Sequence, residues 1–273
     1  MKKKNIKSFL VKVDDIIKLI NLVLISGKIK GERPLSAILI SNIETGKSEI
    51  LSHFMDFNGV IWANDLSRKI LFDSIVPEVE KGSKTHIVCP DFLNYLAHHK
   101  DTVKGTMMGL NAFIEEGLKD IRFYGTERHY SKVVIGGIVF AITKEEYNFR
   151  KKYWKNIGFL SRCIPITYSY SKDTIYEIHN YISNGFKSKK ITLVVPPKRQ
   201  VNIKFTSKSE QELVKMIALG KKKRYETGFR LHKHLRTLAK CIAYYNGSRK
   251  VNIADIDEMR RLLDYINFDY KEI

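Results

Sequence analysis

The sequence predicts an α/β protein in which a mostly parallel sheet, covered by helices, is followed by a smaller α-helical domain. Two observations support this. Short apolar runs alternate with amphipathic helical segments over the first 170 residues, and beyond about residue 171 helical segments continue without further buried strands. Such alternation is typical of parallel strands joined by crossover helices. We therefore expect two domains, residues 1–170 and 171–273.

The individual elements follow from apolar periodicity and from the turn residues between them. Apolar residues at helical spacing, with Asp14 and Asp15 in the first turn, predict the first helix, and the glycines and proline of residues 27–34 end it. The short apolar run 35–41, bounded by turn residues, predicts a buried parallel strand. The same two patterns repeat along the chain. The expected strands span residues 35–41, 59–65, 84–92, 120–125, 132–143 and 164–170, the expected helices span 13–26, 46–57, 66–82, 102–118, 172–186, 209–220, 227–246 and 253–266, and residues 189–205 are expected to be extended.

The charge of the chain favours a polyanionic partner. Its 48 Lys and Arg against 29 Asp and Glu give a net charge of +19, and residues 186–261 alone hold 20 basic against 6 acidic side chains. A basic excess gathered in one part of a protein is the electrostatic footprint expected of nucleic-acid binding, and DNA is the partner we favour. A solvated lysine-rich surface is the alternative.

The three cysteines and the N-terminal region indicate a reducing, non-membrane setting. Cys89, Cys163 and Cys241 are far apart and have no paired spacing with another Cys or with His, so neither a disulfide framework nor a zinc site is expected. Asp14, Asp15 and Lys18 interrupt the first apolar run, which excludes a signal peptide or a membrane span there. We expect a cytoplasmic protein.

The stretch "ISNIETGKSEIL" ends as a phosphate-binding loop does. Such a loop needs inward-pointing backbone N–H groups, a Lys for the β and γ phosphates, and a Ser or Thr for Mg²⁺ at a helix N-terminus. Ser41 stands where the motif has its first glycine, and Ser can occupy that corner if its φ is negative. We therefore expect ATP as ligand. The predicted binding residues are Ser41, Asn42, Ile43, Glu44, Thr45, Gly46, Lys47, Ser48 and Glu49.

Asp91 is the predicted second Mg²⁺ ligand, together with Ser48. It ends the expected strand 84–92, and a carboxylate at that end of a strand lies where a Mg²⁺-water ligand would be placed. A helix N-cap is an alternative or additional role for Asp91. The next position, where hydrolytic enzymes of this broad class have Glu, is Phe92. Asp65 ends the neighbouring strand and could approach the γ phosphate, although an N-cap is the favoured interpretation there.

Three segments resemble the AAA+ ATPases, and most of all the minichromosome-maintenance helicases and their relatives on mobile elements. Residues 26–51 resemble the segment leading through that family's phosphate loop, residues 157–170 its "LLSRFDLIF" stretch, and residues 227–259 its lid. The resemblance implies an AAA+ type core with an α-helical lid, ATP and Mg²⁺ as ligands, and a homo-oligomeric, hexameric ring.

The resemblance also assigns roles to two arginines. Arg162 maps to the arginine that projects into the neighbouring subunit's nucleotide, and Arg230 to the lid arginine that touches the γ phosphate. A guanidinium supplied across an interface stabilises the charge that builds on that phosphate. A salt-bridged residue at a strand start is the alternative for Arg162. For Arg230 it is an exposed basic helix face, where Arg236 is a competing choice.

This sequence departs from the family at three positions, Ser41, Phe92 and Thr143. Thr143 stands where the family has a polar Asn sensor, and its hydroxyl could still orient a water. The departures leave nucleotide binding and ring assembly better supported than fast hydrolysis, so an ATPase of this kind is expected to be slow.

Two groups of basic residues are candidates for contact with DNA. In rings of the resembling kind, hairpins from the region of residues 123–132 line the central pore, and a plain surface turn is the alternative. A salt-sensitive cluster follows further on. The predicted nucleic-acid residues are Arg128, His129 and Lys132 in the first group and Lys221, Lys222, Lys223 and Arg224 in the second.

Three functions remain open from the sequence. The favoured one is a ring ATPase that moves along or remodels DNA, as a replication helicase core or loader does. The second is a basic assembly protein in which ATP sets the oligomeric state with little or no hydrolysis, which Ser41 and Phe92 favour. The third, a single-subunit nucleotide kinase, would need no arginine from a neighbour.

Overall fold

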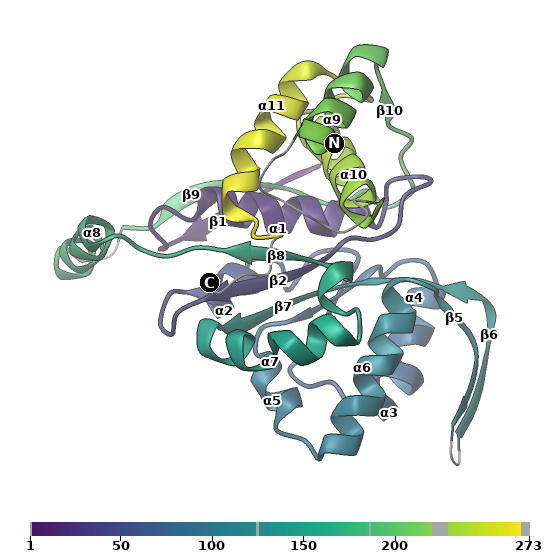
Figure 1. Ribbon diagram of the computed structural model, residues 1–273. Coiled ribbons are helices and arrows are strands. Elements are labelled where there is room, and N and C mark those ends of the chain that lie inside the picture. The colour runs from purple at the N-terminus through teal and green to yellow at the C-terminus, as the bar shows by residue number, and fades with distance from the viewer. Residues whose placement is uncertain (1, 124–125, 186, 220–228, 269–273) are drawn as a thin grey trace.

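The computed structural model describes residues 2–123, 126–185, 187–219 and 229–268 (Figure 1). Its centre is a five-stranded sheet in which every neighbouring pair of strands is parallel. The α/β prediction is therefore confirmed, and the architecture is compatible with a phosphate-loop core. The strands, in their order across the sheet, are β3 (Val60–Trp62), β4 (His86–Cys89), β7 (Gly137–Thr143), β2 (Ser36–Ser41) and β8 (Cys163–Thr167).

Both faces of this sheet are buried, which explains the continuous apolar runs of its strands. On β2, Ala37 and Leu39 belong to one hydrophobic core, whereas Ile38 and Ile40 belong to the other. Successive side chains of a strand point to opposite faces, so one strand supplies both cores. The sheet thereby becomes the middle of three layers.

Two sets of helices cover these faces (Figure 1). The face of Leu39 packs against the N-terminal helix and, beyond it, the C-terminal helices, with the first helix against the long C-terminal one. The face of Ile38 packs against the helices between β3 and β8. The first set is α1 (Asp14–Ser26), α2 (Lys47–Ser52), α9 (Ser207–Leu219), α10 (Phe229–Tyr245) and α11 (Ile253–Leu262), and the second is α3 (Arg68–Ile70), α4 (Val76–Glu80), α5 (Phe92–Leu96), α6 (Lys100–Ile114) and α7 (Lys144–Asn156).

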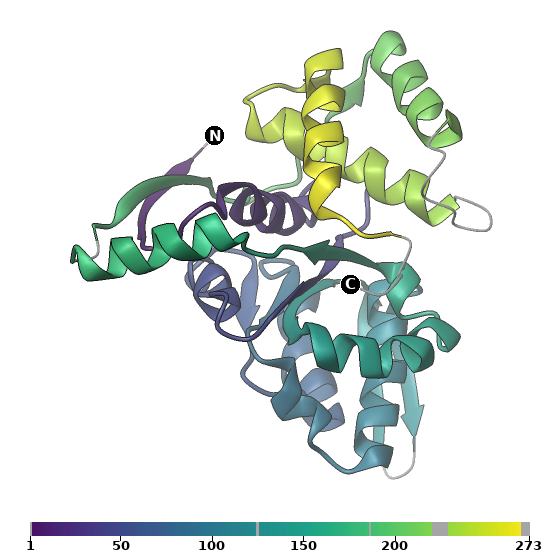
Figure 2. The ribbon, with the colours of Figure 1, turned by 60° about the vertical axis from the view of Figure 1, so that its left-hand side comes forward.

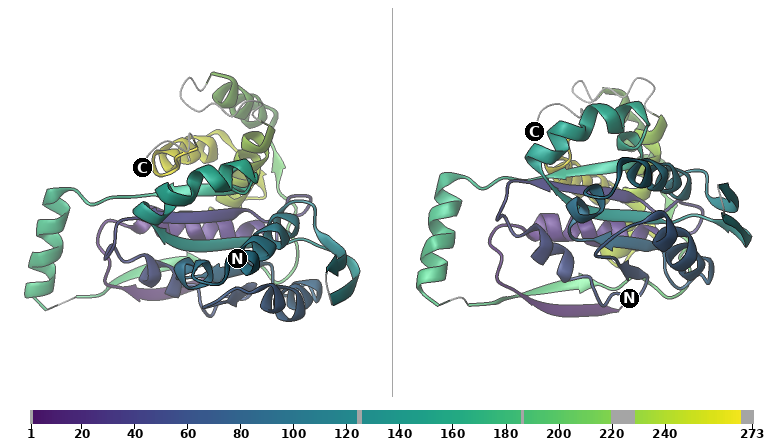
Figure 3. Two further views of the ribbon diagram at one scale, coloured as in Figure 1. Left: turned by 60° about the horizontal axis from the view of Figure 1, so that its bottom comes forward. Right: turned by 90° about the horizontal axis from the view of Figure 1, so that it is seen from below.

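Three small sheets complete the fold. The N-terminal strand β1 (Lys3–Ser8) pairs antiparallel with β9 (Lys189–Val194), which brings the start of the chain beside the segment that leads into the C-terminal helices. Between β8 and β9, helix α8 (Lys172–Ser183) stands away from the rest of the molecule (Figures 2 and 3). The remaining pairs are the antiparallel hairpin β5 (Leu118–Phe123) with β6 (Thr126–Val134), and the parallel pair β10 (Lys204–Phe205) with β11 (Lys250–Val251).

Several elements differ from expectation, each for a local reason. The helix expected over 66–82 contains a π-helical turn at Leu71–Ile75, just before Pro77, which lacks the N–H that a regular helix would need. The helix expected over 46–57 ends at Ser52 and continues as tight turns that bury two phenylalanines. The run 132–143 is divided between β6 and β7. The break falls at Gly136, where a Cβ atom would lie 2.1 Å from the Phe113 ring. Among the described residues, no helix is both long and apolar enough to cross a bilayer.

Candidate functional site

The predicted phosphate loop connects β2 to α2 at the carboxyl end of β2, which lies between β7 and β8 in the sheet. Gly46 has a φ of +85°, a backbone conformation that favours glycine, and a Cβ atom there would also press on the tip of the Leu10 side chain at 2.6 Å. Glu44 also has a positive φ, of 59°, which bends the loop back on itself. Ser41 is buried at the strand end and has no positive φ. The condition that allows Ser to replace the missing glycine is therefore met.

Side-chain hydroxyls hold the loop in this shape. Ser41 Oγ and Thr45 Oγ1 hydrogen-bond to each other, and Thr45 Oγ1 donates to the carbonyl of Asn42 at 2.9 Å. From the end of β8, the hydroxyls of Tyr168 and Tyr170 both donate to the Thr45 carbonyl, at 3.0 Å each. Hydrogen bonds among Ser41, Thr45, Tyr168 and Tyr170 thus connect the loop to the segment that follows β8.

Lys47 folds over the start of the loop. Its Nζ donates to the Ser41 carbonyl at 3.2 Å and to the Asn42 carbonyl. Burial lowers the pKa of the Lys47 ammonium, and the negative charge of Glu145 opposes that shift. A phosphate at the loop would offer this ammonium a full negative charge in place of two carbonyl dipoles. The lysine is therefore poised for an anionic ligand.

Thr143, the last residue of β7, and Glu145, in the first turn of α7, lie beside the loop. Ser41 pairs with Thr143 across the β2–β7 ladder, so the carboxyl ends of the two strands are level. Thr143 caps α7, where its Oγ1 accepts a hydrogen bond from the Glu146 N–H at 3.3 Å, and its own hydroxyl hydrogen remains available to donate. Glu145 lies exposed in the first turn of α7. The Glu145 carboxylate thus lies two residues after Thr143, the predicted sensor residue.

Asp91 follows β4 at the same edge of the sheet, two strands from the loop. Cys89 pairs with Phe140 on β7, which places Asp91 beyond the strand end at the carboxyl edge. Its Oδ1 accepts from the Leu93 N–H at 3.0 Å, so the N-cap role is confirmed. The side chain is exposed, and its second oxygen remains free of the cap. A Mg²⁺ role is compatible with this placement.

Phe92 has no access to that edge. It is fully buried, its ring centroid lies 4.0 Å from that of Phe140 in a stacked arrangement, and Trp154 meets it edge-on at 6.2 Å. The position that follows the aspartate therefore faces the hydrophobic core. A glutamate there would be a buried, unpaired charge.

Asp65 has a different partner from the one expected. Ser67, not Asp65, caps α3, with its Oγ accepting from the Ile70 N–H at 3.2 Å. Asp65 instead pairs with His98 Nε2 at 2.9 Å, so the N-cap expected of Asp65 is wrong. Asp65 lies between the outer strand β3 and α3, and His98 lies between α5 and α6.

A cavity of 510 Å³ opens beside the loop. Its walls come from the start of the loop at Ser41 and Asn42, from Tyr168 after β8, and from Tyr265 near the end of the described chain. Aromatic and polar groups next to a phosphate loop suit the nucleoside part of a nucleotide.

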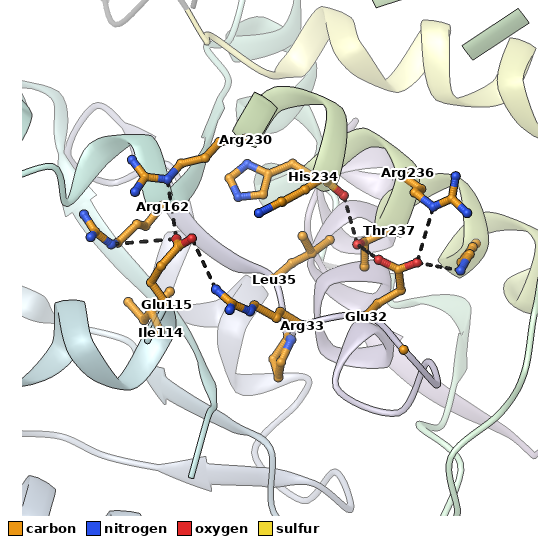
Figure 4. Close-up of a pocket in the computed structure, with 14 residues that line it drawn as sticks. Glu32, Arg33, Leu35, Ile114, Glu115, Arg162, Arg230, His234, Arg236 and Thr237 are labelled. Carbon is orange, nitrogen blue, oxygen red and sulfur yellow. Dashed lines mark hydrogen bonds and ion pairs between the residues drawn. The ribbon is translucent and has the colours of Figure 1, made fainter. Parts of the chain in front are cut away.

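The two predicted arginines lie together beside one glutamate (Figure 4). Arg162 Nε and Arg230 Nε both approach Glu115 Oε2, at 3.8 Å and 3.5 Å. Arg162 also donates to the Gly158 carbonyl at 2.7 Å, and Arg230 to Ser161 Oγ at 2.6 Å. The salt-bridged state expected as the alternative for Arg162 is thus present, without excluding a further role.

These arginines line a basic cavity of 430 Å³. A second carboxylate, Glu32, lies across it and pairs with Lys240 and, at 3.7 Å, with Arg236. Arg236 also contacts Glu210 at 2.7 Å, so it is the more neutralised of the two competing arginines. Partly buried His234 lies between them, and desolvation, reinforced by Arg230 and Lys233, lowers its pKa to about 4.

The arginine pair and the phosphate loop occupy opposite ends of the central strands. Arg162 immediately precedes β8, whose first residue pairs with Ser36 at the start of β2, whereas Lys47 follows the far end of β2. At about 3.3 Å per residue the two ends are roughly 15–20 Å apart. One chain therefore cannot place Arg162 and Lys47 on the same phosphate.

The first group of predicted nucleic-acid residues lies on the hairpin of β5 and β6, which extends from the body (Figure 1). Arg128 is held by Asp73 at 2.9 Å and His129 pairs with Asp120, whereas Lys132 is exposed. In place of the plain turn considered from sequence, the described residues form an antiparallel hairpin whose register shifts between Leu118 and Asp120. The second group, Lys221, Lys222, Lys223 and Arg224, lies outside the described residues.

Several residues that the fold brings to these sites are not apparent from the sequence. Glu145 and Glu115 belong to no sequence motif. Each comes close to its partners only because elements that are far apart in the sequence pack together. Tyr168 and Tyr170 left a weak signal, since two tyrosines alternate at the end of an apolar strand. No cluster of three or more potential metal ligands occurs in the described parts of the chain, and all three cysteines are buried and unpaired.

A scan against protein-family models finds no match, and no curated protein matches the chain significantly.

Proposed function

We propose that this protein is an ATP-binding ring protein of AAA+ type that couples ATP binding and hydrolysis to movement along DNA or to its remodelling. One observation carries the proposal. A phosphate loop lies at the carboxyl end of β2, while an arginine pair lies at the amino end of the adjacent β8. The loop and the arginine pair would form the two halves of a γ-phosphate site, and because they lie at opposite strand ends, a head-to-tail arrangement of subunits would join them.

Within such a site each residue has a defined task. Lys47 would exchange its carbonyl partners for the β and γ phosphates. The Ser48 hydroxyl and the free oxygen of Asp91 are hard oxygen donors of the kind Mg²⁺ prefers, and the metal would neutralise charge on the phosphates. Arg162 and Arg230 of the neighbour would stabilise charge on the γ phosphate. Glu145, beside Lys47, is the carboxylate available to polarise water in place of the missing one.

The DNA part of the proposal is supported by charge and by one projecting element. The net charge of +19 favours a polyanion, and the β5–β6 hairpin extends from the body with Lys132 exposed. Because the hairpin leads directly into β7, which ends beside the loop, a contact made there would lie on the same chain segment as Thr143.

Phe92 favours a second candidate, an assembly protein that ATP gates without turnover. Its ring fills the aromatic core, so this position supplies no carboxylate to the site. If Glu145 does not take over, the protein would bind ATP and assemble but not hydrolyse it.

The decisive experiment is ATP turnover at low salt, with and without single- and double-stranded DNA, for the parent protein, Lys47→Ala and Arg162→Ala. The ring ATPase requires turnover that both substitutions abolish, while Arg162→Ala still binds nucleotide. ATP-dependent assembly without turnover above the Lys47→Ala background would support the second candidate. A protein that stays monomeric with ATP would rule out both.

A further inference from the structure

Glu115 stands at the centre of three arginines from three separate parts of the chain (Figure 4). It ends helix α6 and is 22% exposed. Arg33, just before β2, approaches its Oε1 at 3.2 Å, while Arg162 and Arg230 share its Oε2. Glu116 contacts Arg162 alone, at 3.2 Å, and is 60% exposed. Two carboxylates thus face three guanidinium groups, and the cluster keeps a positive charge.

Glu115 does not satisfy all the hydrogen-bond donors of the arginine cluster. Arg162 Nε is a buried donor without a hydrogen-bond partner among the described residues, because 3.8 Å from Glu115 is an ion-pair distance and not a hydrogen bond. A buried donor without an acceptor is an unfavourable state. A terminal phosphate has three oxygens where a carboxylate has two, so it can bond several guanidinium groups at once. The cluster is therefore better suited to a phosphate than to the carboxylate it holds.

We infer that Glu115 is a positioning residue that holds Arg162 and Arg230 ready in the separate subunit and yields them to the terminal phosphate of a nucleotide bound by a neighbouring copy. The inference rests on the proposed ring function and deepens it. Glu115 keeps the guanidinium groups side by side, which like charges would otherwise resist, and competes with the phosphate for them. Assembly would then require a phosphate that binds the two arginines more strongly than Glu115 does.

The first test measures anion binding to the cluster without nucleotide or assembly. Lys47→Ala serves as parent, because it removes the loop's own anion-binding lysine, and inorganic tripolyphosphate is titrated while thermal unfolding is followed. Adding Glu115→Gln removes the competing charge. We expect it to lower the half-saturating tripolyphosphate concentration by roughly fivefold or more, the lower range of coupling between sites. A further Arg162→Ala should abolish that gain.

Glu116→Gln is the matched control, because it removes the same charge one residue away. Being more exposed and touching one arginine, it should change the half-saturating concentration by less than about twofold. Equal effects of the two substitutions, or no effect of Glu115→Gln, would overturn the inference. If Glu115→Gln does not fold, Glu115→Asp replaces it. The shorter side chain draws the carboxylate back from the arginines and should give a smaller gain in the same direction.

A second measurement separates this inference from the proposed function. In protein with intact Lys47, Glu115→Gln should lower the ATP concentration at half-maximal assembly, measured by light scattering, and leave the response to ADP unchanged. If Glu115→Gln tightens tripolyphosphate binding but ATP does not induce assembly, Glu115 is supported as the counter-ion of the arginines and the ring is contradicted. If the parent protein assembles with ATP but Glu115→Gln does not tighten tripolyphosphate binding, the ring proposal stands and the role of Glu115 is rejected.

Discussion

Arg162 and Arg230 converge on one carboxylate oxygen, Glu115 Oε2, at 3.8 Å and 3.5 Å. The first precedes β8 and the second begins α10, so they come from the sheet and from the C-terminal helices. Their meeting point lies at the amino end of β8, away from Lys47. Two features that the sequence associates with one phosphate are thus separated within a chain.

The first prediction concerns complementation between subunits. Lys47→Ala and Arg162→Ala should each lose turnover, Arg162→Ala by roughly three powers of ten. An equimolar mixture should regain activity, because a subunit with an intact loop can meet a subunit with an intact arginine. In a randomly mixed head-to-tail ring about a quarter of the interfaces combine both. Steady-state turnover of the mixture at constant total protein measures this.

The matched control is a mixture of Lys47→Ala with the double variant Lys47→Ala/Arg162→Ala, in which every loop is defective. It should stay inactive. Arg162→Ala that remains fully active alone would contradict a site shared between subunits.

A second prediction tests the carboxylate beside the loop. Glu145→Gln should lower kcat by roughly a hundredfold or more, with little change in KM, because removing a general base affects the chemical step and not binding. Glu146→Gln, one residue on, is the control. Its carboxylate is bound to Arg150 on its own helix, so turnover should stay near the parent value. Equal kcat in Glu145→Gln and parent would reassign the water-polarising role.

A third prediction concerns the position after Asp91. Phe92→Glu should not create a faster enzyme but should destabilise the fold by at least roughly 3 kcal/mol, because it removes a buried ring and inserts a charge. Urea unfolding followed by tryptophan fluorescence reports this directly, since Trp154 contacts the Phe92 ring. Phe92→Leu keeps the site apolar and should cost less. A stable Phe92→Glu with raised turnover would show that the side chain reaches the nucleotide edge.

A fourth prediction is loss of stability in mild acid. Burial lowers the pKa values of His86 and His234 to about 4 from the ordinary 6.5. Below pH 6.5 these two histidines become protonated in the unfolded chain but stay neutral in the folded protein. The free energy of unfolding therefore falls as the pH drops toward 4 and is fully regained above 6.5. Each histidine should contribute roughly 2 kcal/mol of that fall between about pH 7 and pH 5.

Urea unfolding at the two pH values measures this fall. His234→Gln should remove about half of it, whatever its own effect on stability. Substitution of exposed His99 should leave the difference as it is. A pH difference unchanged by His234→Gln would contradict the assignment.

A fifth prediction concerns the hairpin. Lys132→Ala should weaken DNA binding several-fold at low salt and lower the slope of log affinity against log salt by about one, because one phosphate contact is lost. Lys152→Ala on α7 removes an equally exposed lysine elsewhere and should change neither quantity. Arg128→Ala is less informative, since Arg128 also ties the hairpin to Asp73. Equal weakening by Lys132→Ala and Lys152→Ala would indicate that only net charge matters.

The sequence by itself determined the elements whose patterns are local. Apolar runs fixed the five central strands, since a strand buried on both faces leaves a continuous apolar signature. Gly46, Lys47 and Ser48 indicated a candidate phosphate loop between a strand and a helix, and helices α9, α10 and α11 lie within a few residues of their predicted ranges. The prediction was wrong where partners come from afar. It missed β1, whose partner β9 lies more than 180 residues later. It also assigned Asp65 as a helix N-cap, whereas Asp65 pairs with His98.

Only the tertiary structure decided which side chains meet. Phe92 looked like a missing catalytic residue, and packing shows it as a core residue beside Phe140. Glu115 and Glu145 have no motif, because a carboxylate gains its role from the charges that surround it. The placement of Arg162 and Lys47 at opposite strand ends follows from β8 lying parallel to β2. Strand order and direction are set by long-range packing, which no local pattern encodes.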